Sequence, residues 1–119
     1  MIVRDPQKIF LLGGDGLLGK TFGNLLRSQE VEVISYDSKG ADITSFASLD
    51  KKFRKHRPDI VINCAAIINV DSCESNPRKA WEVNGFGPGN ALRVLKNCRL
   101  SKTTFLHIST CDVFGNAKN

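Results

Sequence analysis

The sequence predicts an α/β protein built on a parallel, four-stranded sheet with helices on both faces. Two observations carry this prediction: four short apolar runs have the pattern of buried strands, and segments with apolar residues at helical spacing lie between them. Because a parallel neighbour must be reached through a crossover, strands that alternate with helices favour a parallel sheet. The chain has 119 residues, so it forms one domain at most.

The first half of the chain supplies two strands and two helices. The run at 9–12 ends in two glycines, as expected of a strand covered on both faces, and residues 17–27 have helical spacing. The β-branched segment 31–36 is a second strand that stops at turn-forming residues. Apolar residues at helical spacing continue over 46–53, and a proline ends that segment.

The second half adds two strands with one helix between them. The apolar run at 60–62 is a third buried strand, and 103–108 is a fourth. Pro77 suits the first turn of a helix that we expect to continue to about Cys98.

Basic residues outnumber acidic residues, 17 against 12, and the excess gathers in one segment. The segment contains Lys51, Lys52, Arg54, Lys55 and Arg57. A basic run of this kind is usually a solvated helix face, so this interpretation is favoured over binding of nucleic acid or another acidic partner.

Cysteine spacing and hydropathy exclude several classes of protein. The four cysteines are 9, 25 and 13 residues apart, which matches no metal-ligand pattern, and His56 and His107 are far apart in sequence. We therefore expect no metal site, and reduced thiols in a cytoplasmic protein. No apolar run reaches the ~18–20 residues that a bilayer requires, so we expect no membrane segment.

The strongest local signal is Gly13-x-x-Gly16-x-x-Gly19, between the first strand and the first helix. The first glycine permits a tight turn, the second lets backbone approach a pyrophosphate, and the third allows close packing of a helix whose N-terminus faces the negative charge. This context favours dinucleotide binding over a plain tight turn. The expected fold is therefore Rossmann-type, a three-layer α/β/α arrangement with strand order 3-2-1-4. The apolar fourth strand would be an edge, which predicts a sheet incomplete on that side and self-association through it.

Two alternatives concern the nucleotide. Gly14-x4-Gly19-Lys20-Thr21 fits the count of a Walker-type loop, so an NTPase is one alternative. Asp37 argues against it, because it ends the second strand 18 residues after Gly19, where a Rossmann fold places the acid that binds the adenosine ribose. The same acid favours NAD as cofactor, whereas Lys39 could meet the 2′-phosphate of NADP.

Further motifs follow the glycines along the chain. They are Asp42-Ile43, Asn63-Cys64-Ala65-Ala66, Asn69-Val70-Asp71 with Glu74, Val83-Asn84 and Ser109-Thr110. In this order they resemble the extended short-chain dehydrogenase/reductases, most of all the group of dTDP-4-dehydrorhamnose reductases and nucleotide-sugar epimerases and dehydratases. The resemblance covers about residues 8 to 116 and implies an NAD(P)-dependent oxidoreductase that acts on a nucleotide-activated sugar.

The resemblance implies a cofactor site made by the segments that follow the strands. It assigns Gly16, Leu17 and Leu18 to the pyrophosphate, Asp37 to the ribose, Asp42 and Ile43 to the adenine, and Ala66, Ile67 and Ile68 to the nicotinamide-ribose side. The small residues Ala65 and Ala66 leave room for a cofactor at the strand ends. Ile67 stands where the family often carries a polar ring.

Two further positions concern the reaction. Pro88 has no N–H for the carbonyl of Asn84, and the resemblance implies that this free carbonyl serves a water relay to the catalytic lysine. The alternative is that Pro88 and the neighbouring glycines simply kink or split the helix. The resemblance also implies that Thr110, with Ser109 beside it, binds the reacting carbonyl of the substrate, although the next two residues depart from the family pattern.

The family's proton donor is a Tyr-x-x-x-Lys pair, and the only tyrosine here, Tyr36, is followed four positions later by Gly40. We therefore expect residues 1–119 to be an NAD(P)-binding Rossmann domain without the catalytic and substrate-binding parts, and inactive alone. The parent is expected to reduce a keto group on a nucleotide-activated sugar. The alternatives are a nucleotide-sugar epimerase or dehydratase, and a non-catalytic NAD(P)-binding regulatory module.

Overall fold

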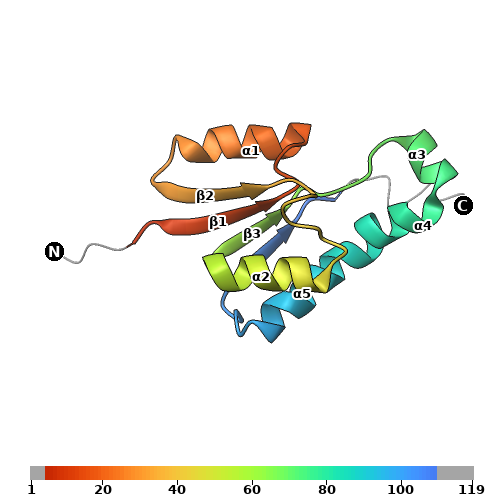
Figure 1. Ribbon diagram of the computed structural model, residues 1–119. Helices are drawn as coiled ribbons and strands as arrows, with labels where there is room; N and C mark the ends of the chain where they lie inside the picture. Colours follow the sequence, from red (N-terminus) through yellow and green to blue (C-terminus); the bar gives the residue numbers. More distant parts are fainter. Residues whose placement is uncertain (1–4, 110–119) are drawn as a thin grey trace, which may run out of the picture.

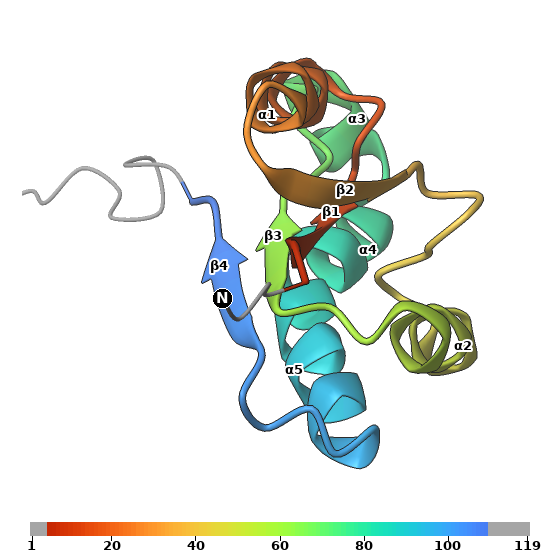
Figure 2. The same ribbon diagram turned by 90° about the vertical axis from the view of Figure 1, so that its left-hand side faces the viewer.

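The computed structural model describes residues 5–109, which form three layers around one parallel sheet (Figure 1). Helix α1 (Leu17–Arg27) covers one face of the sheet, and helices α2 (Phe46–His56) and α5 (Gly87–Asn97) cover the other (Figure 2). The short helices α3 (Val70–Ser75) and α4 (Pro77–Ala80) follow the third strand. None of the helices that the structure describes has the length and apolar composition that crossing a bilayer requires.

The sheet consists of β1 (Gln7–Leu12), β2 (Val31–Tyr36), β3 (Ile60–Asn63) and β4 (Thr104–His107), in the order β2-β1-β3-β4. All neighbouring pairs are parallel, and their last residues are in register: Leu12 is paired with Tyr36 and with Asn63, and Asn63 is paired with His107. The carboxyl ends of the strands therefore lie side by side along one edge of the molecule.

The expected fold class is confirmed, because the sheet is parallel, four-stranded and covered on both faces. In the expected order 3-2-1-4 the third strand lies beside β2, at the edge of the sheet. Here the connection from β2 to α2 consists of turns, and the third strand of the chain, β3, lies between β1 and β4. This central position pairs both sides of the apolar β3, where Val61 and Ile62 are buried, and leaves the more exposed β4 at the edge of the described sheet.

The helix expected from Pro77 to about Cys98 is divided into three parts. After α4 the chain forms a π-helical segment, η1 (Trp81–Phe86), before it continues as α5. Pro88 explains the division, because it cannot donate an N–H to the carbonyl four residues earlier and a wider turn removes that requirement. The helix is therefore split, as the sequence alternative of a kinked or split helix allows.

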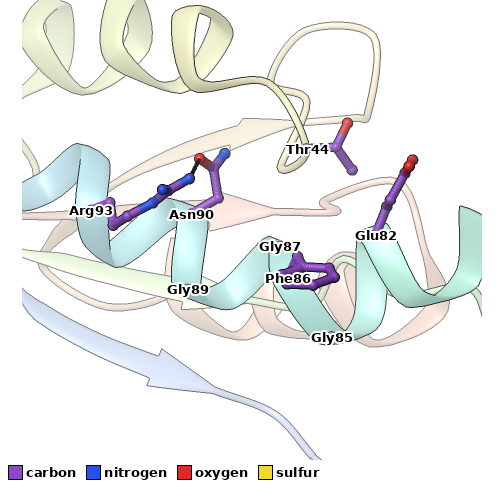
Figure 3. Close-up of a pocket in the computed structure, with 8 residues that line it drawn as sticks. All are labelled: Thr44, Glu82, Gly85, Phe86, Gly87, Gly89, Asn90 and Arg93. Carbon is purple, nitrogen blue, oxygen red and sulfur yellow. Dashed lines mark hydrogen bonds between the residues drawn. The ribbon is translucent and has the colours of Figure 1, made fainter.

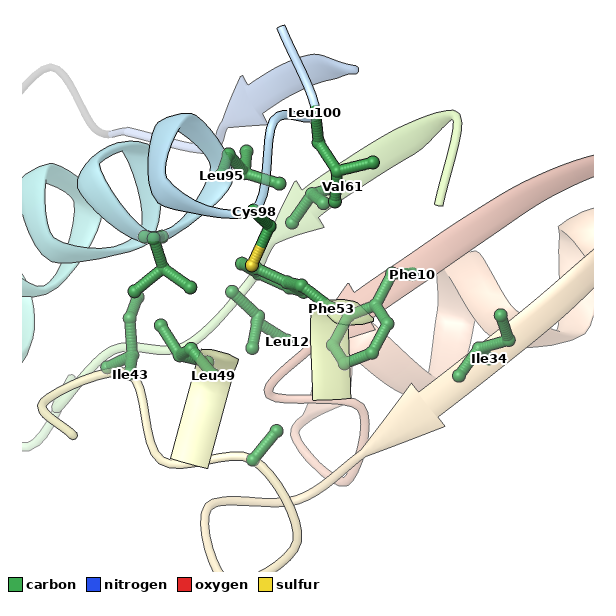
Figure 4. Close-up of a cluster of buried hydrophobic side chains, with 13 residues drawn as sticks. Phe10, Leu12, Ile34, Ile43, Leu49, Phe53, Val61, Leu95, Cys98 and Leu100 are labelled. Carbon is green, nitrogen blue, oxygen red and sulfur yellow. The ribbon is translucent and has the colours of Figure 1, made fainter. Parts of the chain in front are cut away.

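The core fixes β1 from both faces. Phe10 and Leu12 are fully buried against the α2 and α5 layer, whereas Ile9 and Leu11 belong to the cluster under α1. In the larger cluster (Figure 4), Phe53 of α2 packs edge-on against Phe10, with ring centroids 5.2 Å apart and an interplanar angle of 80°. Since β1 leads directly into the glycine turn, this packing also sets the position of that turn.

Replacement of Phe53 by alanine tests the role of this cluster. The substitution removes a fully buried ring, so we expect it to lower the free energy of unfolding by about 3–5 kcal/mol. Urea denaturation followed by circular dichroism measures this change. The matched control is Phe46→Ala on the same helix, which removes a side chain that is 41% exposed and should cost clearly less than Phe53→Ala. Equal losses for the two variants would contradict the assigned core.

Candidate functional site

The carboxyl edge of the sheet brings together segments that are far apart in sequence. The glycine turn follows β1, the acidic turn follows β2, the alanine-containing loop follows β3, and Ser109 follows β4. In open parallel sheets ligands bind in the crevice outside this edge. The edge is therefore the first place to look for a functional site.

Gly13 holds the turn after β1 in a conformation that other residues rarely adopt. Its φ angle is +72°, and a Cβ atom at Gly13 would lie only 2.7 Å from the backbone nitrogen of Ala65. A Cβ atom at Gly19 would overlap the carbonyl oxygen of Gly13. The predicted tight turn is confirmed, and the close contact of Gly19 is with the turn itself. Both positions require glycine for steric reasons.

Gly16 stands at the open end of helix α1. It is the N-cap residue, no side chain caps the helix there, and a Cβ atom would meet nothing nearer than the Gly13 carbonyl oxygen at 3.6 Å. By contrast, Ser45 and Asn69 cap α2 and α3 with their side chains. The N–H groups in the first turn of α1 have no acceptor within the helix, so this end can accept an anion. Leu17 is 87% exposed beside it.

The Walker-type alternative gains no support from the contacts of its residues. The hydroxyl of Thr21, which would face a metal ion in such a loop, donates a hydrogen bond to the carbonyl of Leu17 at 2.8 Å. Residues 5–109 also contain no group of three or more histidine, cysteine, aspartate or glutamate side chains that could hold a metal ion.

Asp37 organises the turn after β2. One of its carboxylate oxygens, Oδ1, accepts the N–H of Gly40 at 2.8 Å, and its carbonyl accepts the N–H of Ala41 at 2.9 Å. The side chain is exposed. Asp37 is thus a turn residue and, through its other carboxylate oxygen, Oδ2, an acceptor that a ligand at the edge can reach.

Asp42 and Ile43 have different surroundings. Asp42 is partly exposed, and its Oδ1 atom accepts both the N–H and the hydroxyl of Thr44, at 2.9 and 2.7 Å. Ile43 is 4% exposed, its side chain belongs to the core, and its carbonyl accepts a hydrogen bond from Asn90 at 2.8 Å. The side chain of Ile43 is therefore not available to a ligand.

Asn84 holds the loop after β3 through its side chain. Its Oδ1 atom accepts the N–H of Ile67 at 2.8 Å, and its Nδ2 atom donates to the carbonyl of the same residue at 2.9 Å. The amide thus pairs with the Ile67 backbone as a neighbouring strand would. Within this loop Ala65 and Ile67 are partly buried, whereas Ala66 is exposed and Ile68 is 87% exposed.

Asn63 is a contributor to this edge that the sequence argument did not assign. It is 1% exposed at the end of β3, its Oδ1 atom accepts the N–H of Ala65 at 3.0 Å, and its amide nitrogen lies 3.1 Å from Nδ1 of His107 on β4. An asparagine at the end of an otherwise apolar strand was the available signal.

Burial raises the pKa of the neighbouring Cys64 thiol, which keeps that thiol protonated at neutral pH.

Two grooves lie beside the edge. A groove of about 450 Å³ runs between Ser38, Asp42 and Thr44 on one side and α4 with η1 on the other. A larger one of about 860 Å³ continues along η1 and α5, from Glu82 to Arg93 (Figure 3). The smaller groove adjoins the acidic turn after β2. Neither groove is lined by the glycines of the turn after β1. Ser109 is exposed after β4, and the predicted Thr110 lies outside the described residues.

The parallel sheet, the glycine turn after β1 and the acid after β2 define a Rossmann-type α/β protein. The family model described as the RmlD substrate binding domain matches residues 7–119, and the chain belongs to this family. The predicted resemblance to dTDP-4-dehydrorhamnose reductases is thereby confirmed.

Three relatives illustrate the match. The chain is 38% identical over 115 residues to the probable low-salt glycan biosynthesis reductase Agl14 of Haloferax volcanii, covering 88% of this chain and 37% of that protein. A dTDP-4-dehydrorhamnose reductase structure from Clostridium acetobutylicum has a TM-score of 0.83 at 36% identity, covering 95% of this chain and 40% of that one. Another from Bacillus anthracis, in complex with NADP, has a TM-score of 0.75 at 26% identity, covering 82% and 35%. The chain therefore spans well under half the length of these relatives.

The pair between Asn84 and Ile67 can be tested by substitution. Asn84→Leu removes both hydrogen bonds at similar side-chain size, so we expect faster amide exchange at Ile67 and a loss of about 0.5–2 kcal/mol in the free energy of unfolding. Asn84→Asp keeps the acceptor, so its amide exchange at Ile67 and its free energy of unfolding should lie between those of the wild type and of Asn84→Leu. The control is Asn24→Leu on the exposed face of α1, which should leave Ile67 unchanged. Unaltered exchange at Ile67 in Asn84→Leu would show that the pair does not hold the loop.

Proposed function

We propose that this chain is the cofactor-binding part of an NAD(P)H-dependent reductase that acts on a keto group of a nucleotide-activated sugar. Membership of the family and 36% identity to the Clostridium acetobutylicum reductase support the class of reaction. The single observation that carries the cofactor-binding role is the glycine turn, which leaves the first turn of α1 uncapped beside the exposed Asp37. An anion and a ribose can be bound there together.

The pyrophosphate is assigned to Gly16, Leu17 and Leu18. The N–H of Gly16 donates to the carbonyl of Gly13 at 3.3 Å, so the backbone donors offered to the ligand are those of Leu17 and Leu18. Gly13 and Gly19 support this role because their lack of side chains lets the turn fold tightly against Ala65 and against itself. The aligned peptide dipoles of the 11-residue helix α1 add partial positive charge at the same point. These groups are fixed by the backbone, so they need little reorganisation when a diphosphate arrives.

The two halves of the dinucleotide would extend from this point in opposite directions. On the adenosine side Asp37 accepts the ribose hydroxyls, and Asp42 with the backbone of Ile43 meets the adenine, because the Ile43 side chain is buried. On the nicotinamide side the loop from Ala65 to Ile68 lines the cleft. Asn84 is assigned to holding that loop through its side chain, which its two hydrogen bonds to Ile67 support.

The reaction side of the site would lie after β4. Thr110 is assigned to the substrate carbonyl, and Ser109, exposed at the carboxyl edge, is assigned to the cofactor. When bound, the reduced nicotinamide supplies the hydride for that carbonyl. The NADP complex of the Bacillus anthracis relative supports NADP as the cofactor. The carboxylate of Asp37 disfavours NADP, because it would repel the 2′-phosphate. We therefore propose NAD(P)H, with NAD favoured by Asp37 and Lys39 as the residue that would meet a 2′-phosphate.

A non-catalytic NAD(P)-binding module is the second candidate. Such a module would need only the cofactor site, and the Tyr36 hydroxyl, which lies 2.8 Å from Nε2 of His56, takes part in the fold. A Tyr-x-x-x-Lys pair in the parent sequence supports the reductase, and its absence there supports the binding module. A nucleotide-sugar epimerase or dehydratase would use the same cofactor site.

Two properties of the chain complete the proposal. Cys64, Cys73 and Cys98 are free thiols, which supports a reducing compartment such as the cytoplasm. The edge strand β4, with exposed side chains, supports self-association through the sheet.

Calorimetric titration with NADH and with NADPH tests the cofactor site directly. We expect binding in the wild-type chain, and at least about 10-fold weaker binding in Gly16→Val, because the added side chain has room in the protein but occupies the space of the diphosphate. The matched control is Gly89→Ala, where a Cβ atom meets nothing within 4 Å and binding should not change. Absence of binding to either dinucleotide, or equal binding by Gly16→Val, would contradict the proposed cofactor site.

A further inference from the structure

Tyr36 and His56 form a pair that the proposed cofactor site does not use. Tyr36 is the last residue of β2, directly before Asp37, and His56 is the last residue of α2. The Tyr36 hydroxyl oxygen lies 2.8 Å from Nε2 of His56, and this contact is partly buried. This contact joins β2, which leads into the acidic turn, to the end of α2. The two residues are 20 positions apart in sequence.

The ring of Tyr36 is enclosed on several sides. Its centroid lies 5.5 Å from that of Phe10 in the core and 5.6 Å from that of the His56 ring. The ammonium group of Lys52 lies over the ring, 4.6 Å from its centroid. Contacts of these kinds, together with the hydroxyl, hold an aromatic side chain in one orientation.

The acidic turn rests on this ring. A Cβ atom at Gly40 would lie 2.6 Å from Cδ1 of Tyr36, so the backbone of Gly40 packs directly against the ring. The N–H of the same Gly40 donates to Oδ1 of Asp37 at 2.8 Å. The position of the Tyr36 ring therefore sets the position of Gly40, and Gly40 sets the orientation of the Asp37 carboxylate.

The state of His56 suits this arrangement. Partial burial lowers the pKa of His56, and the positive charges of Lys55, Lys52 and Lys8 lower it further against the opposing effect of Glu32. At neutral pH the imidazole is therefore uncharged, and its unprotonated nitrogen can accept a hydrogen bond from the Tyr36 hydroxyl.

We propose that Tyr36 and His56 are positioning residues, which hold the turn at Gly40 so that the free oxygen of Asp37 faces the ribose of the bound dinucleotide. The inference rests on the proposed function, because it takes Asp37 as the ribose acceptor. It assigns a role to the end of α2, a helix that contains none of the residues assigned to the cofactor. Neither residue touches the dinucleotide in this arrangement.

The first experiment needs no ligand. Amide exchange at Gly40 is measured by NMR in the wild-type chain and in Tyr36→Phe, His56→Leu and His56→Gln. Tyr36→Phe keeps the ring but removes the hydroxyl, and His56→Gln keeps a polar atom near the position of Nε2. We expect faster exchange at Gly40 in Tyr36→Phe and His56→Leu, and recovery toward wild type in His56→Gln. Unchanged exchange in Tyr36→Phe would overturn the inference, whatever the chain binds.

The second experiment measures the affinity for ADP-ribose by calorimetry. We expect about 3- to 10-fold weaker binding in Tyr36→Phe and His56→Leu, the effect of losing one hydrogen bond that orients an acceptor, and recovery in His56→Gln. Lys51→Ala, an exposed residue of the same helix, is the control that should not change. If the wild type binds and Tyr36→Phe binds equally well, the positioning role fails while the cofactor site stands. If the wild type does not bind, the cofactor site fails, and the Gly40 exchange alone decides whether the pair holds the turn.

Discussion

The close approach of two backbone segments is the constraint on which this structure depends. Gly13 turns with a φ angle of +72° directly against the backbone of Ala65, where a single added carbon would be 2.7 Å from a nitrogen atom. This contact brings the ends of β1 and β3 together and directs the chain into α1 with no side chain over the helix end. The rest of the carboxyl edge is arranged around that uncapped end.

Hydrogen bonds and packing contacts from other parts of the chain fix the segments at the carboxyl edge of the sheet. Asn84 pairs with the backbone of Ile67, and Asn63 joins the end of β3 to β4. Tyr36 supports the turn that contains Asp37. Asn84 itself lies in the π-helical segment η1, so that segment contributes a side chain to the loop after β3. A site built in this way is preorganised, since its backbone donors and acceptors are already fixed before a ligand arrives.

Local patterns predicted the local structure well. The helix at Leu17–Arg27 and the strand at Val31–Tyr36 have the bounds expected from apolar spacing and β-branching, and the glycine turn has the expected geometry. Features that depend on contacts across the chain were not predictable in the same way. The place of β3 beside β1, the burial of Ile43 and the helix α3 are examples, because neighbouring residues in sequence do not specify which distant segment covers them.

The central claim is that the uncapped first turn of α1 receives a diphosphate while Asp37 receives the adjoining ribose. An NMR titration of the ¹⁵N-labelled chain with ADP-ribose tests it most directly, because each amide reports its own surroundings. The account predicts the largest, saturable shifts at the amides of Leu17 and Leu18, together with shifts in the turn that contains Gly40. Saturable shifts confined to the grooves along α4, η1 and α5, with the glycine turn unaffected, would contradict it.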